Sequence, residues 1–177
     1  VDGILPLRYG TPGSLSIEGS GELSNANASL GGGIYLKGYA TGIDDKKTVN
    51  EIEDVRENIL SSKVTIKSNI ASEYGGGIYV EQGFVNLNGA SIQGNKAIFD
   101  GGGVYLNKTS VLLTPNKVAE ATTLTGNVAG LNGGAIYYNY SNQDAKIEVV
   151  ESYVKAISPV IRNLKLDDNE AKNGGGL

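Results

Sequence analysis

The sequence contains no cysteine, histidine, methionine or tryptophan. Without cysteine, the chain can form neither a disulfide framework nor a metal site built on thiolates, and this absence suits a secreted bacterial protein. Without histidine, the chain lacks the side chain that most often acts as a general acid or base. These absences exclude the commonest catalytic and metal-binding chemistries.

Positive charge is also scarce. The chain has 15 basic and 19 acidic residues, for a net charge of −4. Its guanidinium groups are three scattered arginines, Arg8, Arg56 and Arg162, and its one basic pair, Lys46-Lys47, directly follows Asp44-Asp45. Phosphate contacts need clustered lysine and arginine. We therefore expect no nucleic-acid partner.

Long apolar runs are missing as well, since none approaches the roughly 18 residues that a membrane span needs. The first residues, Val1-Asp2-Gly3, do not resemble a signal peptide. The last residues, Gly174 to Leu177, stop in the middle of a motif described below. We interpret residues 1–177 as one segment of a longer protein, with no membrane span inside the segment.

Glycine, in contrast, is abundant at 26 residues, while 40% of the chain is apolar. This combination indicates many turns rather than disorder. A glycine cluster followed by an apolar residue and a tyrosine recurs at residues 31–35, 75–79, 101–105 and 133–137, and residues 174–177 begin a fifth copy. The unequal intervals favour a constant frame that carries loops of variable length.

A second motif precedes the glycines. It consists of isoleucine or leucine, then asparagine three residues later and alanine two residues after that. The copies are Ile66-x-x-Asn69-x-Ala71, Ile92-x-x-Asn95-x-Ala97, Leu124-x-x-Asn127-x-Ala129 and Leu166-x-x-Asn169-x-Ala171. A degenerate copy lies near Asn25, Asn27 and Ala28. A two-part pattern repeated this often predicts a repeat architecture.

The residues after each glycine cluster alternate in polarity, as in a strand. Ile78 and Val80 would point inward, and Tyr79 and Glu81 outward. Further short strands are expected at Val85 to Leu87 and at each Ile/Leu-x-x-Asn motif. One such turn of chain buries too little apolar surface to fold alone, but stacked turns share their buried faces. The sequence therefore predicts an all-β fold, a right-handed parallel β-helix, or solenoid, of about five to six coils with loop insertions.

The glycines and asparagines are expected to shape the corners of this solenoid. Glycine suits positions with positive φ or with too little room for a Cβ atom. Asparagine tolerates the left-handed region best among the other residues. We expect four asparagines to hydrogen-bond along the rod axis and to hold a left-handed turn, forming a structural corner: Asn69, Asn95, Asn127 and Asn169.

The paired motifs resemble the repeats of chlamydial polymorphic membrane proteins and related autotransporter passengers. The resemblance covers the chain from about Ile66 onward, and residues 31–35 in part. Isoleucine or leucine stands where the chlamydial motif has phenylalanine. The resemblance implies a right-handed parallel β-helix, secretion, an outer membrane-anchored parent, and a role in adhesion.

Two insertions are expected, near residues 39–60 and 139–155. In the first, Ile52, Val55 and Ile59 have helical spacing, and Asn50 is a possible N-cap. A short helix, a structured loop or an irregular coil would fit. Long loops on a rigid frame often carry function, so either insertion could bind a partner or be a solvated elaboration.

One tyrosine follows each glycine cluster at an equivalent outward position: Tyr35, Tyr79, Tyr105 and Tyr137. These rings could form a face that binds a glycan or a protein, because tyrosine suits interfaces. They could instead form a stacked stripe that stiffens the sheet or lies under a loop. Both interpretations remain open at this point.

No catalytic, cofactor-binding or metal-binding set is expected. The glycine clusters lack the Gly-Lys-Ser/Thr of a phosphate loop, and Asp44-Asp45 and Asp167-Asp168 lack a third spaced carboxylate for calcium. Two function classes remain. The first is a non-catalytic module of the cell surface or extracellular space, such as an adhesin passenger, stalk or surface fibre. The second is a lyase or hydrolase of acidic polysaccharides, which would need facing carboxylates or a base beside calcium or basic groups.

For the first class, the expected partners are a receptor or glycan on a host or neighbouring cell, or other copies along the rod.

Overall fold

A computed structural model describes residues 16–17, 21–37, 58–60, 64–81, 84–87, 89–107, 111–113, 121–139 and 164–177. Within these residues the secondary structure consists of short strands joined by turns, and no helix occurs. Every pair of neighbouring strands is parallel. The all-β parallel β-helix predicted from the sequence is confirmed.

The strands follow one another in four coils and the start of a fifth. Coil 1 contains β1 (Ser16–Ile17), β2 (Gly21–Ser24), β3 (Asn27–Leu30) and β4 (Ile34–Lys37). Coil 2 contains β5 (Asn58–Leu60), β6 (Val64–Lys67), β7 (Ile70–Tyr74) and β8 (Ile78–Glu81). Coil 3 contains β9 (Phe84–Leu87), β10 (Ser91–Gln93), β11 (Lys96–Ala97) and β12 (Val104–Asn107). Coil 4 contains β13 (Val111–Leu113), β14 (Thr122–Thr125), β15 (Val128–Ala129) and β16 (Ile136–Asn139), and β17 (Leu164–Asp167) begins coil 5.

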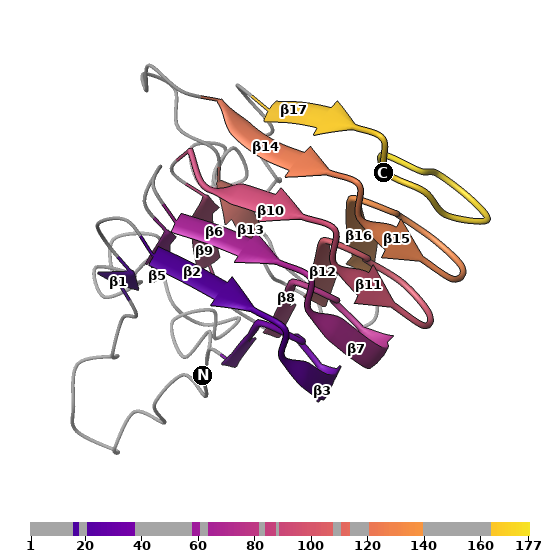
Figure 1. Cartoon of the computed structure of the whole chain (residues 1–177), viewed down its shortest axis with the longest axis horizontal. Coiled ribbons are helices and arrows are strands. Elements are labelled where there is room, and N and C mark those ends of the chain that lie inside the picture. Colours follow the sequence, from indigo (N-terminus) through magenta and orange to yellow (C-terminus); the bar gives the residue numbers. More distant parts are fainter. Residues whose placement is uncertain are drawn as a thin grey trace, which may run out of the picture.

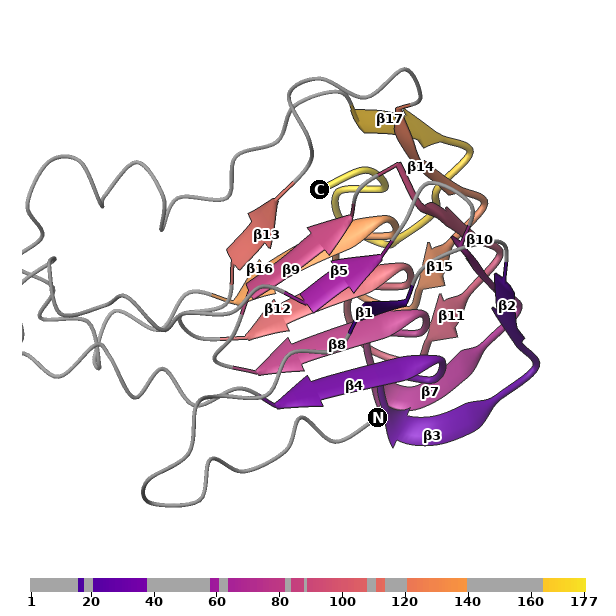
Figure 2. The same ribbon diagram turned by 90° about the vertical axis from the view of Figure 1, so that its left-hand side faces the viewer.

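Equivalent strands of successive coils stack into four sheets. Sheet A has the order β1-β5-β9-β13, sheet B β2-β6-β10-β14-β17, sheet C β3-β7-β11-β15 and sheet D β4-β8-β12-β16. Figure 1 shows the strands of sheet B in sequence order from indigo to yellow, and Figure 2 shows the same order in sheets A and D. The strands after the glycine clusters thus stack in parallel register, as expected.

The core runs along the inside of the coils. The alternation read from the sequence is correct, because Ile78 and Val80 are fully buried. The apolar residue of each Ile/Leu-x-x-Asn motif also points inward, and Ile66, Ile92 and Leu124 have no exposed surface. Each coil therefore covers the apolar face of the next one, which is why the coils are stable only as a stack.

Sheet C was not expected from the sequence, which indicated three strands in each coil. It lies between the asparagine and the glycine cluster, where the alanine of the motif points inward. Two of its strands, Lys96–Ala97 and Val128–Ala129, contain only two residues each. Such short strands carry no period-two pattern, so their pairing depends on the neighbouring coils.

The asparagines form a continuous hydrogen-bonded column along the rod, as predicted. Asn95 represents the repeating unit. Its Nδ2 donates to Oδ1 of Asn127 at 2.9 Å and to the carbonyl oxygen of Ile66 at 3.0 Å. Its Oδ1 accepts from Nδ2 of Asn69 at 3.0 Å and from the backbone N–H of Asn69 at 3.1 Å. The amide is fully buried, yet all its donors and acceptors are satisfied, as burial of a polar group requires.

The column continues to Asn169, whose Oδ1 accepts from Nδ2 of Asn127 at 2.9 Å. In coil 1, Ala26 occupies the equivalent place, and its backbone N–H donates to Oδ1 of Asn69 at 3.0 Å. The same backbone contact occurs at Asn69, Asn95 and Asn127, so coil 1 keeps the backbone contact of the column and lacks the side-chain donor.

The left-handed turn lies one residue earlier than expected. Positive φ angles occur at Asn25 (57°), Ser68 (54°), Gly94 (57°), Gly126 (63°) and Asp168 (50°), and not at the asparagines of the column. The assignment of the turn to the asparagine itself was wrong. The turn residue reaches solvent, where glycine, asparagine, aspartate or serine can adopt this conformation, while the following side chain turns inward to join the column.

The glycine clusters have both of the roles expected of them. In the third cluster, Gly101 has a φ of 67°. A Cβ atom on Gly102 would lie 2.5 Å from the carbonyl oxygen of Gly134 and 2.5 Å from the carbonyl carbon of Val128. Neighbouring coils therefore approach so closely here that only glycine fits at the second position.

Of the two insertions, the structure describes only the boundaries. Asn58–Leu60 is strand β5, so Ile59 belongs to sheet A and its helical spacing with Ile52 and Val55 was misleading. The rest of the predicted first insertion, including the possible cap at Asn50, lies outside the described residues. Strand β16 ends at Asn139, and residues 140–155 of the second insertion also lie outside the described part of the chain.

We expect Asn95→Ala to destabilise the fold by about 1–3 kcal/mol, because buried partners on both neighbouring coils lose their hydrogen bonds. The left-handed residue, Gly94, is unchanged. Gln93→Ala removes a nearby exposed amide and should change stability by no more than about 0.5 kcal/mol. Denaturant unfolding of both variants beside the parent tests this expectation, and equal stabilities would contradict a structural role for the column.

Two glycine substitutions should differ for a steric reason. Gly102→Ala places a methyl group against the backbone of coil 4, and we expect a loss of about 3 kcal/mol or more. Gly126→Ala meets no atom within 4 Å, so only its positive φ opposes alanine, at about 1–2 kcal/mol. Thermal and denaturant unfolding distinguish the two, and a milder effect at Gly102 than at Gly126 would argue against close contact between coils.

Candidate functional site

The four predicted tyrosines form one continuous column on the outside of sheet D. The ring centroids are 5.3 Å apart between Tyr35 and Tyr79, 5.1 Å between Tyr79 and Tyr105, and 5.3 Å between Tyr105 and Tyr137. The rings of the middle pair are almost parallel, with 7° between their planes. The parallel register of sheet D places each ring over the ring of the next coil.

Hydrogen bonds connect the tyrosine hydroxyls to side chains of the following coil. The hydroxyl of Tyr35 donates to Oε2 of Glu81 at 2.8 Å, and Nδ2 of Asn107 donates to the hydroxyl oxygen of Tyr79 at 2.8 Å. Glu81 and Asn107 occupy the same register position, two residues after their own tyrosines. The column is thus fixed at both its ring faces and its hydroxyl ends.

A second aromatic row flanks the column at the corner between sheets C and D. The centroid of Tyr74 lies 4.8 Å from that of Tyr105 and 5.6 Å from that of Phe99. The sequence analysis did not single out either residue of this second row. Tyr74 and Phe99 lack a common offset from the glycine clusters, so the repeat pattern gave no signal for them.

The central rings have little contact with solvent. Tyr79 and Tyr105 are each only 5% exposed, whereas Tyr35 and Tyr137 are half-buried. This arrangement fits the stiffening role for the two central rings. Binding of a partner through the column remains a prediction, and the two outer rings offer the larger ring surfaces for it.

Burial also affects the acidity of the central tyrosines. Loss of hydration raises the pKa of Tyr105 well above its ordinary value, and the hydrogen bond with Asn139 offsets only part of this effect. Loss of hydration also raises the pKa of Tyr79, with a further contribution from the negative charge of Glu81. Both rings therefore resist ionisation in the folded chain.

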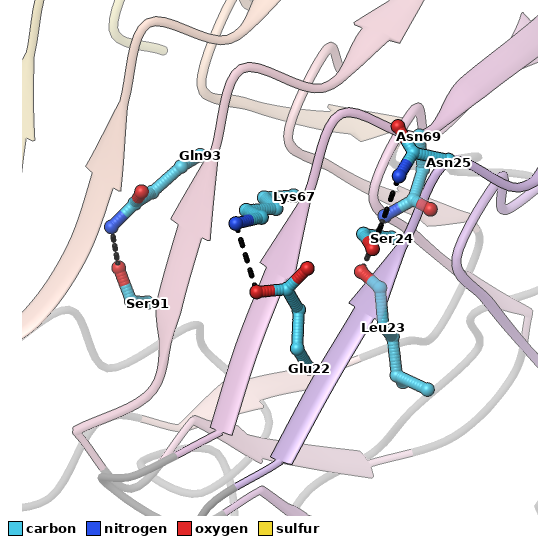
Figure 3. A network of polar contacts seen from close by, with 8 residues as sticks. All are labelled: Glu22, Leu23, Ser24, Asn25, Lys67, Asn69, Ser91 and Gln93. Atoms are coloured by element: carbon cyan, nitrogen blue, oxygen red, sulfur yellow. Dashed lines mark hydrogen bonds and ion pairs between the residues drawn. The ribbon is translucent and has the colours of Figure 1, made fainter.

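The outer face of sheet B is a polar surface of a different kind (Figure 3). Lys67 forms an ion pair of 2.8 Å with Glu22 on the neighbouring coil, and this contact lowers the pKa of Glu22. Nε2 of Gln93 donates to Oγ of Ser91, and the hydroxyl groups of Ser91 and Thr123 lie 3.0 Å apart. The Lys67–Glu22 and Ser91–Thr123 contacts join neighbouring coils, and the Gln93–Ser91 contact lies within one strand. Ion pairs at a protein surface contribute little to stability.

Among the described residues, Asp167-Asp168 does not form a recognisable centre. Asp167 is exposed and lies 3.5 Å from the ammonium group of Lys165 on the same strand, and Asp168 occupies the left-handed turn. Asp44-Asp45 lies outside the described residues. Across the described ranges, histidine, cysteine, aspartate and glutamate nowhere gather in a group of three that could hold a metal ion. The same part of the chain includes no helix suited to crossing a membrane.

The raised tyrosine pKa values predict a loss of stability at high pH. Since the folded chain favours the neutral rings, their contribution is complete below the unfolded pKa of about 10 and disappears as the pH rises through the higher folded values. We expect the denaturant midpoint to fall above about pH 10, and the fall to be smaller in Tyr105→Phe. A midpoint that decreases equally in Tyr105→Phe and the parent would assign the effect to other groups.

Comparison with curated proteins and with solved structures found no match. A family model, the Chlamydia polymorphic membrane protein repeat, matches the chain twice, at residues 63–81 and 121–139. These segments contain the strands of sheets B, C and D in coils 2 and 4, with the asparagine column and the glycine cluster in both. The repeats of coils 2 and 4 therefore match the Chlamydia polymorphic membrane protein repeat.

Proposed function

We propose that this chain is a non-catalytic module of a cell-surface or secreted protein, and that it acts as an adhesin passenger, a stalk or a surface fibre. The two matches to a repeat of membrane proteins support a location at the outer surface, with an outer membrane-anchored parent. The observation that carries the proposal is the architecture. Backbone, asparagine and tyrosine contacts all run from coil to coil along one axis.

A rod built in this way is suited to holding a binding surface away from a membrane. Each coil adds about 4.8 Å of length, and the close-packed glycine corners leave little freedom for bending. Stiffness also favours binding, because a rigid partner loses less conformational entropy when a complex forms. Both effects suit an adhesin or a stalk.

The half-buried outer rings are the candidate contacts for a receptor or glycan on a host or neighbouring cell. Tyr137 lies next to Asn139, whose Nδ2 donates to Oδ1 of Asn107 at 3.2 Å. An aromatic ring beside amide groups offers one apolar surface and several hydrogen-bonding groups to a sugar or a peptide. The proposal therefore places recognition at the exposed parts of the tyrosine column.

Beads coated with the purified chain should bind cultured epithelial cells saturably, and soluble chain should compete with them. Tyr137→Ser should weaken binding about fivefold, which is typical of truncating an aromatic contact in an interface. Thr123→Ala, on the outer face of sheet B, is the matched control and should bind like the parent. Binding no greater than that of beads coated with unrelated protein would refute the adhesin role.

The alternative function, degradation of acidic polysaccharides, has a separate readout. We expect the purified chain to produce neither hydrolysis nor elimination on pectin or alginate, with or without calcium. Turnover that disappears in Asp167→Asn or Asp168→Asn would replace the proposed function with an enzymatic one.

A further inference from the structure

Among the described residues of coils 2 to 4, the large exposed apolar side chains lie on the outer face of sheet C and in the turns that follow its strands. Ile70 is 45% exposed, Ile98 51%, Phe99 39% and Leu131 40%. Val128 on coil 4 is partly exposed. It lies in one row of paired residues with Lys96 on coil 3 and Ile70 on coil 2. We call these five apolar residues the sheet C patch.

The members of the patch lie on adjacent coils rather than scattered over the surface. The backbone N–H of Leu131 donates to the carbonyl oxygen of Phe99 at 2.8 Å, so these two residues are direct neighbours. The backbone N–H of Gly130 likewise donates to the carbonyl oxygen of Ala97 at 3.1 Å, which places Gly130 beside Ile98. Contiguous exposed apolar surface of this kind marks an interaction site.

Charged side chains lie at the two ends of the patch and within it. Glu73 lies on coil 2, Lys96 lies within the patch on coil 3, and Glu170 and Lys172 lie on coil 5. All four are exposed. The face thus carries two negative and two positive charges, which favours a partner with the same balanced pattern over a strongly acidic or basic one.

We propose that the sheet C patch binds the same patch on a second copy of this chain. The two rods would lie antiparallel, related by a two-fold axis that runs along the strands between coils 3 and 4. With such an axis, coil 3 of one copy faces coil 4 of the other copy, and coil 2 faces coil 5. Residues that face each other lie at the same position along the strand. An interface of this type must be complementary to itself.

This symmetry produces matching contacts at the centre of the interface. Phe99 of one copy lies against Leu131 of the other. Ile98 lies against Gly130, which occupies the equivalent position on coil 4. Because the same pairs occur twice in a two-fold dimer, Phe99 and Leu131 are covered in both copies.

The same axis brings unlike charges together at the border. Lys172 on coil 5 of one copy lies beside Glu73 on coil 2 of the other, and Lys96 lies one coil away from Glu170 of the other copy. Within a single chain, Glu73 and Lys172 are three coils apart, roughly 14 Å at the usual strand spacing. Any pairing between these two side chains must therefore occur between molecules.

The patch is small, so the dimer belongs to the weak, transient class of interfaces. Sedimentation equilibrium over a wide range of protein concentration is the direct measurement, and we expect a monomer–dimer equilibrium. Phe99→Ser should weaken association about tenfold, since it removes a central aromatic contact from both halves of the interface. Gln93→Ala, on sheet B, is the control and should associate like the parent, with circular dichroism showing that both variants remain folded.

A charge exchange tests the orientation of the two copies. Lys172→Glu and Glu73→Lys should each weaken association, because each places like charges together twice. The double variant should restore association to near the level of the parent. A parallel arrangement would keep these residues apart, and the double variant would then show no restoration.

Two outcomes would overturn the proposal. One is a parent that remains monomeric at every concentration. The other is association that Phe99→Ser does not weaken. If the parent is monomeric and Phe99→Ser instead reduces binding of coated beads to cells, the patch contacts a different protein. The inference is independent of the proposed adhesin function, because sedimentation of the purified chain needs no receptor.

Discussion

The close approach of neighbouring coils is the constraint on which the rest of this structure depends. Parallel strands one coil apart share backbone hydrogen bonds, and at the second glycine of each cluster the two backbones leave no room for a Cβ atom. Once this spacing is fixed, equivalent side chains of successive coils must meet. Asparagine therefore bonds to asparagine, and tyrosine stacks on tyrosine.

The interior and exterior columns solve different physical problems. A buried amide loses its hydration and needs all of its hydrogen bonds within the protein, and the asparagine column supplies them through its own repetition. The tyrosine column lies outside the apolar core and is covered at its centre by its neighbours and by Tyr74. Its stability comes from ring contacts and from hydroxyl contacts with the next coil.

Much of the fold could be predicted because the repeat fixes it. The alternation around Ile78 identified the strands of sheet D, and the common offset of Asn95 and Asn127 from the glycines indicated the polar column. Sheet C was missed because strands such as Lys96–Ala97 are too short to show a pattern. The turn was placed on asparagine because of its known tolerance for positive φ, whereas burial in the column is a stronger demand on that side chain.

The candidate surfaces were harder to predict than the core. Tyr79 and Tyr105 were correctly placed outside the core, but their burial depends on neighbours such as Tyr74 that come from other parts of the repeat. The sheet C patch was not predicted at all, since Ile98, Phe99 and Leu131 have no equivalents in every coil. A repeat pattern predicts only the features that recur in every coil, so features of individual coils cannot be predicted from it.

The corners of the coil differ in how much variation in length they tolerate. The connection from sheet B to sheet C always contains two residues, and the glycine corner is closed by backbone contacts. Between sheets D and A, in contrast, β8 ends at Glu81 and β9 begins at Phe84, whereas β4 ends at Lys37 and β5 begins at Asn58. The same frame thus accommodates connections of very different length at one corner. That corner is the natural place to graft a foreign peptide, such as an epitope or an affinity tag, onto the rod.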